Sequence, residues 1–249
     1  MNQPPTTTPH LLTTALLQAG LPQPSPIFLH PILTPSSGRL PPLSSLLATT
    51  RVRLLNADIT NANVLSPQTP SFPASITSTT LKSSSLSADI PCQILDIEDL
   101  SRSKWDIVES LESERKGETT KGREVIRVLP TQPEDSTQAT QFPLAATTPA
   151  VQQKSHGPFK VLLQDVKGQK VYGFELKRVE KLSYPPGMNI GCKVILKKDV
   201  KVARGMVLLE PESITVLGGK IEAVDKAWKE MRENRLREAV GAPPIGGAR

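Results

Sequence analysis

The chain has 249 residues, of which only nine are aromatic and 24 are proline, and it carries 30 lysine and arginine residues against 24 aspartate and glutamate residues. This composition argues against a core that extends through the whole length, so only part of the chain is expected to pack. The apolar runs fall short of the roughly 20 residues of a membrane helix, and the N-terminus lacks the pattern of a secretory signal. The chain is therefore expected to be soluble, and its two isolated cysteines favour a reducing compartment, the cytosol or the nucleus.

Three short helices are predicted in residues 1–60. Leucine and alanine recur at helical spacing between residues 10 and 20. A second helix is expected after Ser25, with Pro26 at its first position, where the missing N–H costs nothing. A third is expected from Leu43 to Asn56. Together they predict a small N-terminal helical bundle.

Two stretches have a composition that buries too little apolar surface to offset the entropy of ordering. Serine, threonine and proline make up 16 of the 33 residues from 57 to 89, so residues 61–89 are predicted to form a linker or a loosely held arm. The second stretch, 116–156, is polar apart from an apolar island at 125–129. A loop of this length inside a domain is usually functional or disordered.

The remaining chain predicts strands between two helices. Residues 90–97 indicate a strand, and residues 102–115 indicate a helix capped by Ser101 or Ser103. From Phe159 onward, short β-branched runs separated by glycine and proline predict a small barrel or sandwich. A helix with an apolar stripe is expected at 220–239, within a C-terminal helix and tail at 220–249. The predicted fold class is therefore α+β.

Positive charge is concentrated in the strand-rich part. Residues 157–204 contain 11 lysines and arginines and 4 acidic residues. This concentration favours a polyanion or an acidic protein surface as the partner, with a solvated basic face without a ligand as the alternative.

Strand alternation places Tyr172 and Phe174 on one face, where their rings could stack nucleic-acid bases beside Lys177 and Arg178. The alternative is that both rings belong to the barrel core. A second basic series surrounds a later strand and its turn, and it includes Lys193, Lys197, Lys198, Lys201 and Arg204. Lysines that protect a sheet edge from aggregation are the alternative explanation for that series.

No catalytic, cofactor or metal site is predicted. The glycines of the segment 187–194 are separated by three residues where a phosphate-binding loop needs four, and the final serine or threonine is missing. The three histidines have no second ligand at helical spacing. Asp96, Glu98 and Asp99 are clustered, but no second carboxylate in apolar surroundings is evident that would raise the pKa of one of them. They are expected to cap the following helix. The chain is therefore not expected to be an enzyme.

The run from Ala203 to Gly219, ARGMVLLEPESITVLGG, closely resembles the most recognisable block of the RecQ-mediated genome instability protein family, R-x-G-x-L-L-L-x-P-E-x-V-x-V-L-G-G. The resemblance extends upstream through the Pro-Pro-Gly turn at 185–187 and the strand at 192–196, and it is weaker toward residue 10. Because members with a second OB-fold are much longer, this chain resembles the short fungal form. The resemblance therefore implies that this chain does not bind the kind of partner that docks on a second OB-fold.

The resemblance implies a five-stranded OB-fold barrel over residues 90–219 in a non-catalytic, nuclear subunit that contacts no membrane. Such a subunit binds topoisomerase III, acts with a RecQ helicase to dissolve double Holliday junctions, and contacts DNA weakly. Lys193 would contact the topoisomerase, with Lys197 and Lys198 beside it. The loop 116–156 would enter the DNA gate of the topoisomerase, where the contact residues would be Lys116, Lys121, Arg123, Val125 and Arg127.

A second function remains open at this point. A stand-alone OB-fold could bind single-stranded nucleic acid through the aromatic and basic residues of the strands. The residues that this alternative requires are Tyr172, Phe174, Lys177, Arg178, Lys201 and Arg204.

Overall fold

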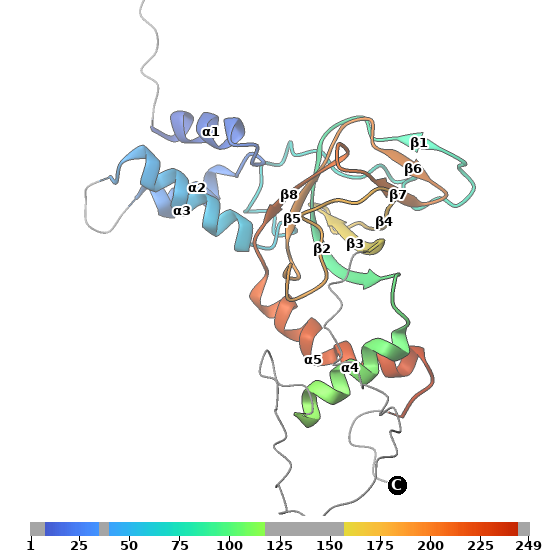
Figure 1. The fold of residues 1–249 in the computed structure, drawn as a ribbon. Coiled ribbons are helices and arrows are strands. Elements are labelled where there is room, and N and C mark those ends of the chain that lie inside the picture. The colour runs from blue at the N-terminus through green and yellow to red at the C-terminus, as the bar shows by residue number, and fades with distance from the viewer. Residues whose placement is uncertain (1–7, 35–39, 118–156, 244–249) are drawn as a thin grey trace, which may run out of the picture.

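The structure is a computed structural model, and it describes residues 8–34, 40–117 and 157–243. Five helices and one mixed sheet make an α+β fold in the described part, which confirms the predicted class (Figure 1). Within these ranges, no helix is long and apolar enough to cross a lipid bilayer.

The three predicted N-terminal helices are present, as α1 (Thr8–Gln18), α2 (Pro26–Leu33) and α3 (Leu43–Asn56). Ser25 caps α2, because its hydroxyl oxygen accepts a hydrogen bond from the Phe28 backbone N–H at 3.1 Å. The helices share a small core of their own, which includes Leu12, Leu16, Leu29, Ile32, Leu46 and Leu54.

The segment that follows α3 is not the loosely held arm that its composition predicts. Phe72, Ile76 and Leu86 are buried in the core of the sheet, and the Phe72 backbone N–H donates to the buried carboxylate of Asp165 at 2.8 Å. Three apolar anchors, together with backbone hydrogen bonds to the sheet, order a segment that average composition would leave free. The prediction of a loosely held arm is therefore wrong for these residues.

One eight-stranded sheet follows, with the strand order β1-β6-β7-β4-β3-β2-β5-β8. Its neighbours are antiparallel except for β4 and β7, which are parallel. The strands are β1 (Ser84–Ser85), β2 (Ile90–Asp99), β3 (Phe159–Asp165), β4 (Lys170–Glu175), β5 (Lys193–Leu196), β6 (Lys201–Ala203), β7 (Met206–Leu209) and β8 (Ile214–Gly218).

The number of strands exceeds the five expected. One reason is that β1 lies in the predicted linker 61–89, and another is that a turn divides the run 192–202 into β5 and β6. Asp199 has a positive φ of 66° in the turn that separates β5 from β6. Pro211 lies in the turn between β7 and β8, where the Ser213 N–H donates to the Glu210 carbonyl at 2.9 Å. Because β7 pairs with β4 while β8 pairs with β5, this short turn connects two distant parts of the sheet, which curls around its core.

Helices α4 (Lys104–Lys116) and α5 (Glu222–Ala239) lie together at one end of the curled sheet (Figure 1). The hydroxyl of Ser103 caps α4 by accepting the Asp106 N–H at 3.0 Å. Trp228 of α5 is buried, donates its indole N–H to Asp96 of β2, and packs edge-on against Tyr184 with ring centroids 6.0 Å apart. These contacts attach α5 to the sheet.

Candidate partner-binding site

Lys193 is buried, although the resemblance implies a contact with a partner. Its side chain is in β5, the residue is 4% exposed, and its ammonium donates to the Gly191 carbonyl at 2.6 Å. Burial lowers the pKa of Lys193 to about 8, although Cys192 and Asp58 act in the opposite direction. Leu54 and Leu55 of α3 line a small cavity of about 10 Å³ together with Lys193, so the helical region packs beside this side chain.

A partly buried polar network next to Lys193 joins the helical region to the sheet. The amide group of Gln93 in β2 donates to the Asp58 carboxylate at 2.8 Å and to the side-chain oxygen of Gln164 at 3.0 Å. The Gln93 oxygen accepts the Ile59 N–H at 3.2 Å. Partial burial alone would raise the pKa of Asp58, but hydrogen bonds from Thr60 and Gln93 and the charge of Lys193 hold it below its ordinary value. The sequence gives no signal for this network, because its members are far apart along the chain.

Two glycines of the Ala203–Gly219 block occupy positions where the structure leaves no room for a side chain. Gly205 has a φ of +78°, and a Cβ there would lie 2.7 Å from the Thr77 carbonyl oxygen. Gly219 has a φ of +84°, and a Cβ there would collide with the Leu55 carbonyl at the end of α3. The block therefore supplies the positions at which the N-terminal part of the chain approaches the sheet most closely.

Lys197 and Lys198 lie on the surface, apart from the buried Lys193. The Lys197 ammonium is 3.4 Å from a carboxylate oxygen of Asp89, and the other oxygen of Asp89 accepts the Lys198 backbone N–H at 2.8 Å. The resemblance assigns Lys193, Lys197 and Lys198 to one contact, and in the structure only Lys197 and Lys198 are accessible to a partner.

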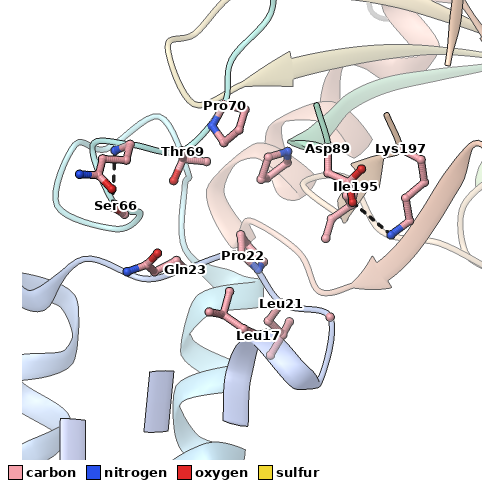
Figure 2. Close-up of a pocket in the computed structure, with 13 residues that line it drawn as sticks. Leu17, Leu21, Pro22, Gln23, Ser66, Thr69, Pro70, Asp89, Ile195 and Lys197 are labelled. Carbon is pink, nitrogen blue, oxygen red and sulfur yellow. Dashed lines mark hydrogen bonds and ion pairs between the residues drawn. The ribbon is translucent and has the colours of Figure 1, made fainter. Parts of the chain in front are cut away.

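A groove of about 540 Å³ lies beside Lys197. Its lining comes from the turn after α1, the loop at 66–70, the residues at the start of β2 and the residues at the end of β5 (Figure 2). Its lining includes Leu17, Leu21, Pro22, Ser66, Thr69, Pro70, Asp89, Ile195 and Lys197. The groove is a surface feature of the junction between the helical region and the sheet.

The predicted gate loop is described only at its ends. Lys116 belongs to the last turn of α4 and pairs with Glu112 at 2.9 Å, so the loop begins one residue later than predicted. Gly117 ends the helix with a φ of 73°. The other predicted contact residues, Lys121, Arg123, Val125 and Arg127, lie outside the described residues.

The returning end of the predicted loop is fixed to the sheet. The Leu100 N–H donates to the Pro158 carbonyl at 3.0 Å, and the buried carboxylate of Glu175 accepts the backbone N–H groups of Phe159 at 2.9 Å and Val179 at 2.8 Å. The residues that flank the segment 118–156 therefore belong to ordered elements, α4 on one side and β3 on the other.

Tyr172 and Phe174 share one face of β4, as the alternation predicts, and that face is the outer one. Tyr172 is 47% exposed and Phe174 is partly exposed, whereas Val171, Gly173 and Glu175 point into the core. The alternative that both rings form the barrel core is therefore wrong. The Lys160 ammonium lies 4.6 Å from the centroid of the Tyr172 ring, on the surface where a base would stack.

The remaining basic candidates are dispersed. Lys177 pairs with Glu210 at 3.0 Å. Arg178 pairs with Glu175 and lies 5.1 Å from the Phe159 ring centroid. Arg204 forms the β6–β7 turn with a φ of 49°, and Lys201 is exposed on β6. Two of these four residues, Lys177 and Arg178, are therefore already paired with carboxylates.

Within the described ranges, no group of three or more histidine, cysteine, aspartate or glutamate side chains is arranged to hold a metal ion. Burial and the charge of Asp165 raise the pKa of Cys92, and burial raises the pKa of Cys192 to about 11. Both buried thiols therefore stay protonated at neutral pH.

The topology defines the class of protein. The antiparallel strands β2, β3 and β4, the parallel contact of β4 with β7, and the return of β5 to β2 are the arrangement of an OB-fold barrel. Residues 72–232 match the family described as "RMI1, N-terminal OB-fold domain". The chain belongs to the RMI1 family, which confirms the resemblance found in the sequence.

A named relative is consistent with this assignment. The chain is 33% identical over 110 residues to RecQ-mediated genome instability protein 1 of Schizosaccharomyces pombe. The match covers 43% of this chain and 46% of the relative, so it spans about half the length of that protein. The family consists of genome-stability OB-fold subunits that are generally non-catalytic scaffolds.

Proposed function

We propose that this protein is a non-catalytic, nuclear subunit that binds and modulates topoisomerase III in a complex with a RecQ helicase, and so promotes double Holliday junction dissolution and DNA decatenation. The observation that carries the proposal is the family match over residues 72–232, which includes the OB-fold barrel and the Ala203–Gly219 block. The relative is named for RecQ-mediated genome instability, which supports an assignment to the same pathway.

We assign the binding role to the barrel and the modulating role to the inserted segment. The barrel is a rigid scaffold, because its strands and the segment before β2 share one core. The segment 118–156 connects α4 to β3, so each of its ends is attached to an ordered element. A segment held in this way can bias a topoisomerase gate only by contacting its open and closed states differently.

The binding part of the proposal is tested by co-elution of the full chain with purified topoisomerase III at micromolar concentrations. A stoichiometric complex is expected, and the double variant Lys197→Glu/Lys198→Glu should bind about tenfold or more weakly, because it reverses two exposed charges. Lys82→Glu is the matched control, since it reverses an exposed lysine on a different segment. Absence of a complex with the unaltered chain would reject the proposal.

The modulating part is tested separately. Residues 118–156 are replaced by a short glycine–serine linker, which should leave the complex intact and change the rate of decatenation. Unchanged decatenation by an intact complex would remove the role of the loop and leave the scaffold role in place.

A further inference from the structure

Six apolar side chains lie together on the outside of the sheet. Tyr172 in β4 is opposite Leu162 in β3 and Met206 in β7, and Phe174 is opposite Leu208. Leu176 follows β4 directly, donates its backbone N–H to the Leu209 carbonyl at 2.8 Å, and is 54% exposed. We call this set the outer apolar face, and it consists of Leu162, Tyr172, Phe174, Leu176, Met206 and Leu208.

The helices of the described chain lie elsewhere. The N-terminal helices contact the sheet through Leu217 of β8 and the Gln93 network, and in Figure 1 they lie beside β5 and β8. Helices α4 and α5 contact the end of β2 through Glu98 and Asp96. All six side chains of the outer apolar face remain at least partly exposed in the described structure. A contiguous exposed apolar patch usually marks a site of interaction.

Lysines border this face. Lys160 lies on its β3 side and Lys201 on its β6 side, while Lys170 and Lys177 stand at the two ends of β4. Glu98 pairs with Lys160 at 3.3 Å, and Glu210 pairs with Lys177 at 3.0 Å. Because two lysines are neutralised locally and Lys170 and Lys201 add further positive charge, the border favours an acidic partner.

The side chains favour a protein over a nucleic acid. Four of the six are aliphatic and offer no surface on which a base could stack. The Lys160 ammonium already lies 4.6 Å from the Tyr172 ring centroid. An apolar centre that contains tyrosine, phenylalanine and methionine, within a charged border, is the composition of a protein interface.

The shape of the face favours a helix as the occupant. Three neighbouring strands span about 10 Å, since adjacent strands are about 4.8 Å apart, and an α-helix with its side chains is about 10 Å wide. A helix lying along β4 would place an apolar stripe against Tyr172, Phe174 and Leu176, with acidic residues beside the stripe meeting the lysines. We propose that the outer apolar face binds an amphipathic helix of a partner protein, with a leucine-rich stripe flanked by aspartate and glutamate. This surface goes beyond the proposed function and does not depend on it.

The test uses a fluorescein-labelled synthetic helical peptide of about 18 residues, with leucine at i, i+3, i+4 and i+7 spacing and glutamate beside the stripe. Fluorescence anisotropy with the full chain should show saturable binding. The double variant Tyr172→Glu/Leu176→Glu should weaken it about tenfold or more. Val52→Glu is the matched control, because Val52 is an equally exposed apolar residue, 59% exposed, on α3. A peptide with lysine in place of glutamate should bind more weakly than the acidic peptide.

A second variant keeps the test decisive if the first fails to fold by circular dichroism. Lys170→Glu/Lys201→Glu changes only exposed border residues and should weaken the acidic peptide selectively. The proposal is overturned by a peptide that does not bind, or that binds the face variants as well as Val52→Glu. Loss of oligothymidine binding in the face variants, with peptide binding unchanged, would overturn it in favour of single-stranded DNA. Self-association in sedimentation velocity that disappears on Leu176→Glu would overturn it in favour of a second copy.

Discussion

Lys193 is a cation held inside the junction between two parts of the chain. Its ammonium is bonded to the Gly191 carbonyl, and Asp58 is close enough to raise its pKa against the effect of burial. A side chain in this position reaches a partner only if β5 moves. We infer that Lys193 positions the junction, and that the accessible lysines near it, Lys197 and Lys198, are the better candidates for direct contact.

The buried lysine makes stability depend on pH. Its pKa is about 8 in the folded chain and 10.5 ordinarily, so burial destabilises the fold fully below pH 8, and this cost is relieved as the pH rises toward 10.5. Lys193→Met removes the cost. The free energy of unfolding of the variant, relative to the unaltered chain, should therefore fall by up to about 3 kcal/mol between pH 8 and 10.5. Urea denaturation at several pH values measures this difference.

The control for this prediction is Lys82→Met, which also removes a lysine but from an exposed position. Its effect on stability should show no comparable change over the same pH range. A difference between Lys193→Met and the unaltered chain that is independent of pH would show that Lys193 is charged in the fold without cost.

At the scale of elements, ion pairs connect α4 and α5. Arg237 of α5 is 3.1 Å from Glu112 of α4 and 3.1 Å from Glu233 of its own helix. Arg115 of α4 is 3.7 Å from Glu233. The arginine is mostly enclosed by this pair of helices, so its charge is less screened than that of a surface residue.

Arg237→Ala should destabilise the chain by about 1 kcal/mol, because it removes an enclosed arginine that bridges two helices. Hydrogen exchange measured by mass spectrometry should become faster in α4 and remain unchanged in β2. Lys226→Ala is the control on the same helix, since Lys226 pairs with Glu230 at 3.9 Å on an open surface. Equal exchange in the two variants would show that packing, rather than the Arg237 ion pairs, holds α4.

Local signals were enough to predict the helices. The spacing of leucines predicted α3 at Leu43–Asn56, and Ser25 followed by Pro26 predicted the start of α2. The order of residues 57–89 was missed because it depends on contacts with residues far along the chain, such as that of Phe72 with Asp165. Composition averages over a segment, whereas a few well-placed anchors decide whether it packs.

The outer apolar face was only half predictable. Alternation establishes that Tyr172 and Phe174 share a side of β4, but it does not say whether that side is the inner or the outer one. The curl of the sheet decides this, and the curl depends on pairings between β4 and β7 and between β5 and β8. Such pairings leave no trace in the local pattern.

At the scale of the whole molecule, two hydrophobic cores meet at a junction that contains polar contacts as well as the apolar contact of Leu217. One core belongs to the sheet and the other to the N-terminal helices. Between them lie the Gln93 network, the hydrogen bond from the Lys220 N–H to Asn56 at 3.3 Å, and the close approach of Gly219 to Leu55. Short backbone and polar contacts therefore add to the apolar packing at the junction.

Neighbouring glycines allow this dependence to be measured. Gly218 and Gly219 both have positive φ, but a Cβ at Gly218 would meet no atom within 4 Å, whereas one at Gly219 would collide with the Leu55 carbonyl. Gly218→Ala should cost about 1 kcal/mol of backbone strain. Gly219→Ala should cost about 2 kcal/mol more and make the residues after α3 susceptible to limited proteolysis. Equal costs for the two variants would show that the helical region is not held at this point.

The attachment of the segment 118–156 has a consequence for how this chain can vary. The segment leaves from α4 and returns at Pro158, whose carbonyl accepts the Leu100 N–H, so it is an extension of a single hairpin. Lengthening a flexible connection costs little extra closure entropy, about 0.6 kcal/mol for each doubling. The barrel should therefore tolerate changes in the length of this insertion, because they leave its strands and its core unchanged.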